Sequence, residues 1–315
     1  MTRTVKNKIL GVIALLTAAA LWGGSFVTQL LGMKNLTPLA FNSLRFTLGA
    51  ITLLPLITLS TGRTKPKNWT RTIVDCFISG GLLFAAISVE QYALNMSSNA
   101  GRSGFITALY IIMVPFMGLF LGEKARWKTF VAPIFSVVGL AMLTLSGPQG
   151  SLTVSDGLLL LGAFGFAVQL IVVNRSTINP IHLSIGQLFV AAGLSWLCTL
   201  FMGQMPSGSD VLGSLWPVLF SGVLSTGIAY SLQVFGQQHV AAAPSAILMS
   251  MESLFSVVFG ALFLGERMGL VAYIGCVFML AGTVISQLPN KNQPDITETE
   301  YVEHEPTGRE EMMSK

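Results

Sequence analysis

The stretch LFLGEK, residues 119–124, returns with one change as LFLGER at residues 262–267. The two copies lie 143 positions apart in a chain of 315 residues. Chance similarity between two leucine-rich helices would explain this motif, but not further landmarks in register with it. Four such landmarks repeat at nearly the same spacing: Pro38 with Pro180, Ser79-Gly80 with Ser221-Gly222, Gln91 with Gln233, and Gly139 with Gly282. The sequence therefore predicts two related halves.

The composition around these motifs is that of an integral membrane protein. Hydrophobic residues make up 52% of the chain and charged residues only 10%, whereas an average soluble domain has roughly 25% charged residues. A helix needs about 20 apolar residues to cross the hydrocarbon region. The runs are continuous and lack the strict alternation of barrel strands, so the predicted fold class is an all-α integral membrane protein. We expect ten transmembrane helices, at residues 9–31, 39–59, 73–95, 102–121, 128–146, 157–173, 183–203, 214–236, 244–264 and 269–288.

Positively charged residues near the ends of these runs predict the orientation. If the N-terminus is cytoplasmic, fourteen Lys and Arg residues fall on the cytoplasmic side, and Lys34 and Arg267 fall on the other. With an even number of helices, both termini are then cytoplasmic. The first run continues to Leu31, too long for a typical signal peptide, so we expect an uncleaved span. The predicted location is the inner (plasma) membrane, as a multi-pass protein.

Five predicted helices separate the two copies of the motif, and an odd number reverses the direction of the second half. We therefore expect two inverted five-helix repeats, residues 1–146 and 147–290, followed by an acidic, disordered cytoplasmic tail at 291–315. Inverted repeats are typical of secondary transporters, whose halves rock about a site near the bilayer midplane. Within the motif, Gly122 and Gly265 suit the residue that follows a helix C-terminus, so the motif itself is interpreted as structural.

These residues also resemble a known family. ALWGGSFV in the first run, LRFTLGAI in the second, and LFLGEK or LFLGER at helix ends are similar to EamA-domain members of the drug/metabolite transporter superfamily. The resemblance extends over about residues 9–288. It implies a bacterial inner-membrane carrier, often an exporter of amino acids or other small metabolites, with a central cavity between the halves. One departure is Glu252-Ser253, where many members have Glu-Pro.

Polar groups are costly in lipid and tend to face the interior of a helix bundle, so they are the candidates for a substrate cavity. Glu252 lies deep in its predicted span and shares a helix face with Met249 and Ser256. Tyr230 and Gln233 form a similar stripe in the preceding span. Together they are expected to line a cavity with one titratable carboxyl group. The alternative for Glu252 is a structural hydrogen bond to a neighbouring helix.

The first half contributes three further cavity candidates. Trp22 and Ser25 share a face of the first span, and Trp22 lies away from the interfacial regions that Trp usually occupies. We expect its ring to stack against a substrate or to gate the cavity, with a packed or lipid-facing indole as an equal alternative. Tyr110 falls almost opposite Glu252 in the repeat and is the third candidate.

Arg45, Glu90 and Arg102 form a separate group of charged residues. The predicted orientation places all three at the same depth, toward the non-cytoplasmic third of the membrane. Three interpretations remain open: an ion-paired outer gate, a cationic site that attracts a carboxylate or phosphate, or a purely structural bridge.

The sequence contains no phosphate-binding glycine loop with a lysine, no HExxH pair and no GxSxG elbow. We therefore expect no enzyme, no metal or other cofactor, and no nucleic-acid partner. The predicted function is a secondary transporter, expected to be an exporter, that moves small metabolites such as amino acids or amines by alternating access. The expected partners are this substrate and the lipid bilayer, with protons as a candidate coupling ion.

Two other function classes stay in play. One is an integral-membrane enzyme acting on lipid-linked substrates, and the other is a passive channel or scaffold. The substrate, the direction of transport, the coupling ion and the oligomeric state are left open by the sequence.

Overall fold

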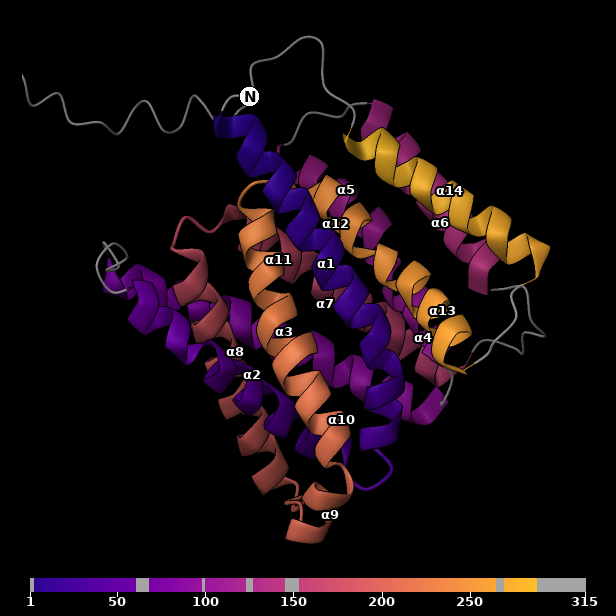
Figure 1. The fold of residues 1–315 in the computed structure, drawn as a ribbon. Helices are drawn as coiled ribbons and strands as arrows, with labels where there is room; N and C mark the ends of the chain where they lie inside the picture. Colours follow the sequence, from indigo (N-terminus) through magenta and orange to yellow (C-terminus); the bar gives the residue numbers. More distant parts are fainter. Residues whose placement is uncertain are drawn as a thin grey trace, which may run out of the picture.

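The computed structural model describes residues 3–60, 68–97, 100–122, 127–144, 153–264 and 269–287. Within these ranges the chain is almost entirely helical and forms no strand (Figure 1). The first half contains α1 (Arg3–Gly32), α2 (Pro38–Ser60), α3 (Trp69–Ser97), α4 (Ala100–Thr107), α5 (Tyr110–Phe120) and α6 (Trp127–Thr144). The second contains α7 (Val154–Arg175), α8 (Pro180–Phe201), α9 (Gly208–Gly213), α10 (Leu215–Leu219), the π-helix η1 (Phe220–Ile228), α11 (Ala229–Gln237), α12 (Ala242–Met249), α13 (Met251–Leu264) and α14 (Leu270–Gln287).

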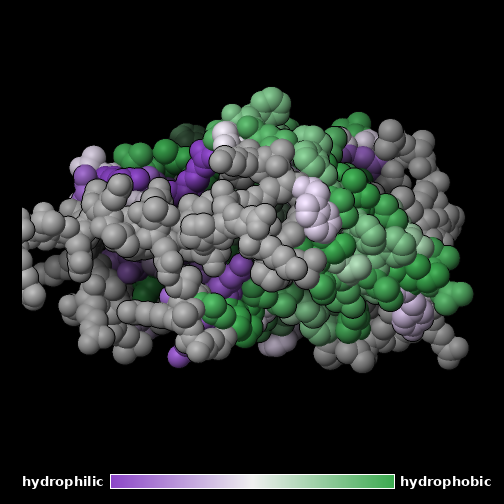
Figure 2. Space-filling model, turned by 90° about the horizontal axis from the view of Figure 1, so that it is seen from above, coloured by the Kyte–Doolittle hydropathy of each residue, from purple (hydrophilic) through white to green (hydrophobic). Residues whose placement is uncertain are grey.

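The lengths and surfaces of these helices suit a membrane. Among the described residues, five segments are long and apolar enough to cross it: Val5–Gly32, Trp69–Met96, Val154–Arg175, Pro180–Phe201 and Leu215–Gln237. Large apolar side chains also lie exposed on the outside of the helices, and the view from above shows hydrophobic residues gathered over one side of the molecule (Figure 2). Such a surface is stable in contact with lipid.

Several helix ends follow from local sequence signals. Pro38 and Pro180 are the first residues of α2 and α8, where a missing N–H has no consequence. Gly122 follows the end of α5 with φ +87°, so the prediction of a glycine after the helix is confirmed there. Gly265 lies outside the described residues.

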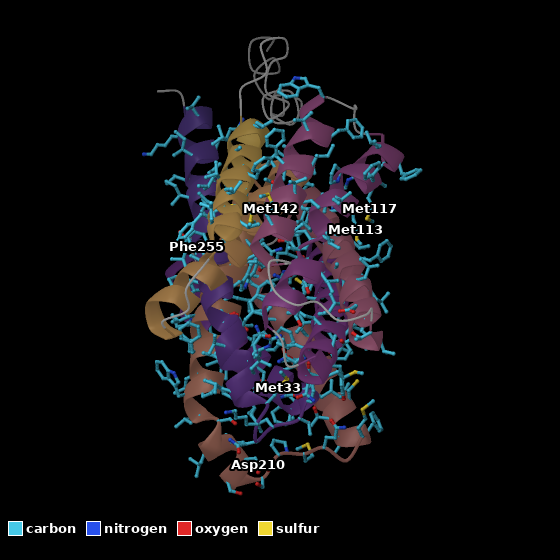
Figure 3. All side chains as sticks on the ribbon, turned by 90° about the vertical axis from the view of Figure 1, so that its right-hand side faces the viewer. Met33, Met113, Met117, Met142, Asp210 and Phe255 are labelled. Carbon is cyan, nitrogen blue, oxygen red and sulfur yellow. The ribbon has the colours of Figure 1, made fainter. Side chains whose placement is uncertain are left out.

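The short helix α9 lies at the end of the molecule opposite Met113 and Met117 (Figure 3). Its first turn is closed by a capping box, in which the Ser207 N–H donates to Asp210 at 2.9 Å and the Asp210 N–H donates to the Ser207 hydroxyl. Hydrogen bonds from Ser207 hold the pKa of the Asp210 carboxyl below its ordinary value.

Helices of the two halves pack on each other in matching pairs. The contact of α3 with α7 corresponds to that of α11 with α1. The contact of α3 with α8 corresponds to that of η1 with α2. α1 contacts α13, as α7 contacts α4 and α5. α2 crosses α8, and α6 crosses α14 (Figure 1). Each of these contacts therefore has a counterpart in which the corresponding helices of the two halves are exchanged.

The repeated glycines lie at these helix crossings. A Cβ atom added to Gly80 would lie 2.6 Å from the Gln187 carbonyl oxygen of α8, and one added to Gly222 would lie 2.7 Å from Leu48 Cβ of α2. Gly139 and Gly282 make the same kind of approach between α6 and α14. Because no larger residue fits between the backbones, glycine recurs at equivalent positions.

Two helices that the sequence predicts as continuous are broken. The predicted helix at 102–121 is interrupted between α4 and α5, and that at 244–264 is interrupted between α12 and α13 at Ser250. At the first break, the Leu109 N–H bonds to the Ile106 carbonyl and the Ile111 N–H to the Ala108 carbonyl, a tighter turn than in an α-helix. The two breaks occupy equivalent places in the two halves.

Candidate substrate cavity

A cavity lies between helices of both halves. Eight of the nine residues predicted as candidates line it: Trp22, Ser25, Arg45, Glu90, Tyr110, Tyr230, Gln233 and Glu252. The ninth, Arg102, lies on α4, but its side chain is outside the described residues. Two groups of candidates that the sequence kept apart therefore meet in one site.

The helix breaks deliver polar side chains to this cavity. Thr107 is the last residue of α4 and Tyr110 the first of α5; Met249 ends α12 and Glu252 is the second residue of α13. All four line the cavity. Discontinuous helices of this kind form the substrate sites of many secondary transporters, because backbone outside a regular helix is tolerated where it lines a cavity.

Trp22 joins the two halves at one wall of the cavity. Its indole N–H donates to the Ser225 carbonyl oxygen of η1 at 2.9 Å, and its ring lies 5.0 Å from the ring of Tyr230. On the same helix, the Ser25 hydroxyl donates to the Trp22 carbonyl and accepts from Gln29 at 3.1 Å. These contacts fix the orientation of the aromatic wall.

A chain of amides runs from the cavity into the bundle. Gln233 donates to Gln169 at 3.3 Å, and Gln169 donates to Gln187 at 3.2 Å. Within the described part of the chain, the buried Oε1 of Gln233 has no hydrogen-bond partner. The sequence-based predictions did not include Gln169 or Ser225; for Gln169 a signal existed, because its amide interrupts the apolar run LLLLGAFGFAVQLIVV.

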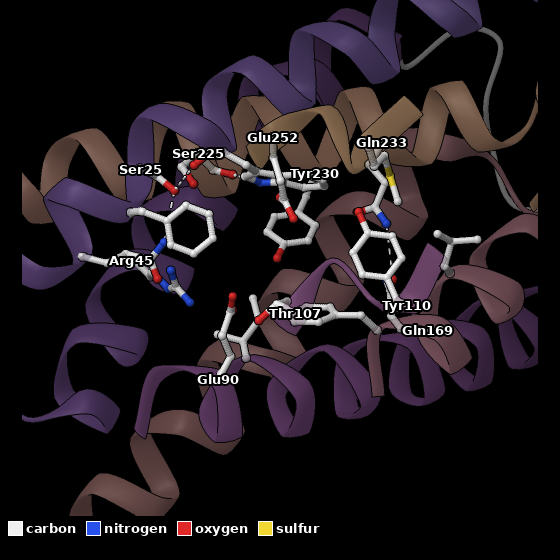
Figure 4. Close-up of a pocket in the computed structure, with 17 residues that line it drawn as sticks. Ser25, Arg45, Glu90, Thr107, Tyr110, Gln169, Ser225, Tyr230, Gln233 and Glu252 are labelled. Carbon is white, nitrogen blue, oxygen red and sulfur yellow. Dashed lines mark hydrogen bonds between the residues drawn. The ribbon is translucent and has the colours of Figure 1, made fainter. Parts of the chain in front are cut away.

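Three charged residues extend into the same space (Figure 4). Arg45 enters near one end, Glu90 comes from one wall, and Glu252 from the opposite wall beside Tyr230. Arg45 is 3% exposed, and the two carboxylic acids are each 7% exposed. In the described part of the chain, neither Arg45 nor Glu90 forms a salt bridge. Arg45 and Glu90 thus share a cavity with Glu252.

Comparison with known proteins shows the family to which this chain belongs. The sequence model described as the EamA-like transporter family matches the chain twice, at residues 9–145 and at 154–287. The chain belongs to the EamA-like transporter family. Membership in this family indicates a multi-pass membrane protein that is related to transporters. The resemblance to the EamA family, expected from the sequence motifs, is confirmed.

Relatives and a solved structure agree with this membership. An uncharacterized transporter of Archaeoglobus fulgidus is 24% identical over 279 residues, covering 88% of this chain and 85% of the relative. The threonine/homoserine exporter RhtA of Salmonella typhimurium is 26% identical over 229 residues, covering 70% of this chain and 75% of RhtA. A crystal structure with 19% identity superimposes with a TM-score of 0.72 over 90% of this chain and 98% of its own, which shows a shared fold.

Proposed function

We propose that this EamA-family protein is a secondary transporter that exports small metabolites, such as amino acids or amines, by alternating access. The observation that carries the proposal is the polar cavity at the two helix breaks, which contains two carboxylic acids and one guanidinium group. A buried ionisable residue in a membrane protein has a cost that function usually explains. The name of RhtA supports amino acids as the exported class.

The arrangement of the halves supports alternating access. The family match covers each half separately, and the contacts between halves come in exchanged pairs. Two inverted five-helix repeats, residues 1–146 and 147–290, would exchange these contacts as the cavity opens first to one side and then to the other. Ten spans and two cytoplasmic termini complete the proposed topology.

Glu252 is the proposed coupling residue. It is buried at the second helix break, faces the cavity, and has no hydrogen-bond partner among the described residues. A carboxyl group in that position can hold a proton or bind a substrate amine, and the two would compete for it. Proton exchange at Glu252 would then link substrate movement to the proton gradient.

The test is transport by purified protein in liposomes with a panel of radiolabelled amino acids and amines, with and without an imposed pH gradient. We expect the gradient to accelerate transport by the wild type and to have little effect on Glu252→Gln, because glutamine cannot release a proton. Asp210→Asn is the matched control, since Asp210 lies on α9 and does not line the cavity, so the substitution should leave the response unchanged.

If Glu252→Gln is folded, transports at the wild-type rate and responds equally to the gradient, Glu252 is structural and coupling lies elsewhere. Flux that does not saturate with substrate concentration would favour a channel over a transporter.

A further inference from the structure

We infer that Arg45 is the anion-binding residue of the cavity and that the substrate is a zwitterion whose carboxylate it binds. The inference rests on the proposed transport function and goes further, because it selects amino acids over simple amines. Its basis is the charge that each wall presents and the hydrogen-bond donors left without partners.

The first observation is an unsatisfied guanidinium group. Arg45 is 3% exposed, and neither its Nε nor its Nη2 atom has a hydrogen-bond partner among the residues that the structure describes. Buried charges in proteins are normally paired and hydrogen-bonded, since an isolated one is strongly unfavourable. Arg45 lines the cavity, so this guanidinium group borders the space that a substrate would occupy.

The second observation is how Arg45 is held. Its Cζ atom lies 5.3 Å from the ring centroid of Phe46 and 5.7 Å from that of Phe41. Aromatic faces stabilise a guanidinium group without accepting its N–H bonds. The contacts therefore support the charge and leave its fork of donors available, the geometry that binds a carboxylate through two parallel hydrogen bonds.

The other walls of the cavity suit a positively charged group on the ligand. Glu90 and Glu252 line the cavity without a hydrogen-bond or ion-pair partner among the described residues. Tyr230, beside Glu252, and Trp22, 5.0 Å from Tyr230, present aromatic rings that also attract a cation. An ammonium group near Glu252 and a carboxylate at Arg45 would satisfy groups on different walls with one molecule.

The count of charges favours a carboxylate over a phosphate and a zwitterion over an amine. With one guanidinium and two carboxylates, the empty cavity has a net charge of −1 when all three are ionised. A phosphate would add about two negative charges beside two carboxylates in a site of low dielectric constant. A simple amine would leave the Arg45 donors unsatisfied. A zwitterion can pair its carboxylate with Arg45 and its ammonium group with one carboxylate, and one proton can neutralise the other carboxylate. The cavity and its ligand then have no net charge.

The experiment measures binding to the full-length protein in detergent. Standard L-amino acids are screened by the shift in unfolding temperature. For each one that stabilises the wild type, the dissociation constants of the acid, its methyl ester and its decarboxylated amine are measured by calorimetry. We expect the wild type to bind the acid at least about tenfold more tightly than the ester or the amine, because these lack the carboxylate.

Arg45→Gln should raise the dissociation constant of the acid by about ten- to one-hundredfold. It should change the dissociation constants of the ester and the amine by less than about threefold. Arg45→Lys should bind the acid with intermediate affinity, because lysine keeps the charge and loses the fork. Arg71→Gln is the matched control: Arg71 is exposed on α3 outside the cavity, so all three affinities should stay at the wild-type values.

Three results would overturn the inference: equal affinity of the wild type for acid, ester and amine; equal loss for all three in Arg45→Gln; or no binding of any amino acid. If Arg45→Gln does not fold, the wild-type comparison and Arg45→Lys decide the question. Gradient-driven transport of amines alone would overturn the inference that the substrate is a zwitterion, but it would still support the proposed transporter. The two proposals can therefore fail separately.

Discussion

At the residue scale, Trp22 combines two roles that its position in the sequence left open. Its ring faces Tyr230 in the cavity, and its N–H bonds to the carbonyl oxygen of Ser225. The ring wall is therefore oriented by a hydrogen bond between α1 and the π-helix η1. A π-helix displaces backbone carbonyls from their regular positions, and such segments are frequent at functional sites.

Trp22→Phe should remove this hydrogen bond and keep an aromatic ring against Tyr230. We expect a loss of about 1 kcal/mol in the free energy of unfolding, the typical contribution of one hydrogen bond. Thermal unfolding in detergent, followed by circular dichroism, would measure it. Trp216→Phe is the control, since Trp216 is 68% exposed on the outside of the bundle. Equal unfolding temperatures for both variants would show that the Trp22 bond contributes nothing.

At the element scale, the glycines explain how helices of the two halves come so close together. Gly80 and Gly81 are adjacent in α3, yet only the first faces α8. A Cβ on Gly80 would lie 2.6 Å from the Gln187 carbonyl and 2.7 Å from Val190 Cβ, whereas nothing lies within 4 Å of one on Gly81. The pair therefore separates helix packing from helix propensity.

Gly80→Ala should lower the free energy of unfolding by roughly 1–3 kcal/mol, because the added methyl group forces α3 away from α8. Gly81→Ala should leave it unchanged or raise it slightly, since alanine favours the helix more than glycine does. Unfolding temperatures of the two purified variants would be compared with the wild type. A loss of the same size in Gly81→Ala would contradict packing at the α3–α8 crossing as the cause.

At the scale of the whole molecule, the distribution of charge predicts the orientation in the membrane. Fourteen Lys and Arg residues lie near one set of predicted helix ends, whereas only Lys34 and Arg267 lie near the other set. This prediction places the segment between α1 and α2 and the segment before α9 on the non-cytoplasmic side. The same prediction assigns residues 61–67, which lie outside the described residues, to the cytoplasm.

Single cysteines at Thr37 and Ser207 should therefore react with an impermeant thiol reagent added to intact cells, and one at Lys65 should react only after the membrane is opened. The background is a variant in which Cys76, Cys198 and Cys276 are replaced by serine or alanine. The orientation would be reversed if Lys65 were labelled in intact cells and the other two positions were not.

Hydrophobic runs, repeated landmarks and the EamA motifs determined from sequence alone that this is a helical membrane protein of a transporter family. They could do so because lipid requires long apolar helices, and close helix crossings require glycine at fixed positions. The polar residues in the spans also identified eight residues of the cavity, since ionisable groups seldom face lipid. These signals are local and can be read one helix at a time.

Only the tertiary structure decided which candidates share a site. Arg45 and Glu90, predicted as a group separate from Glu252, line one cavity with it, and Gln169 and Ser225 join them. The breaks at Leu109 and Ser250 were not predicted either, because apolar periodicity runs through both. Depth in the membrane can be estimated along one helix, but the rotation and crossing of helices depend on contacts between residues far apart in sequence.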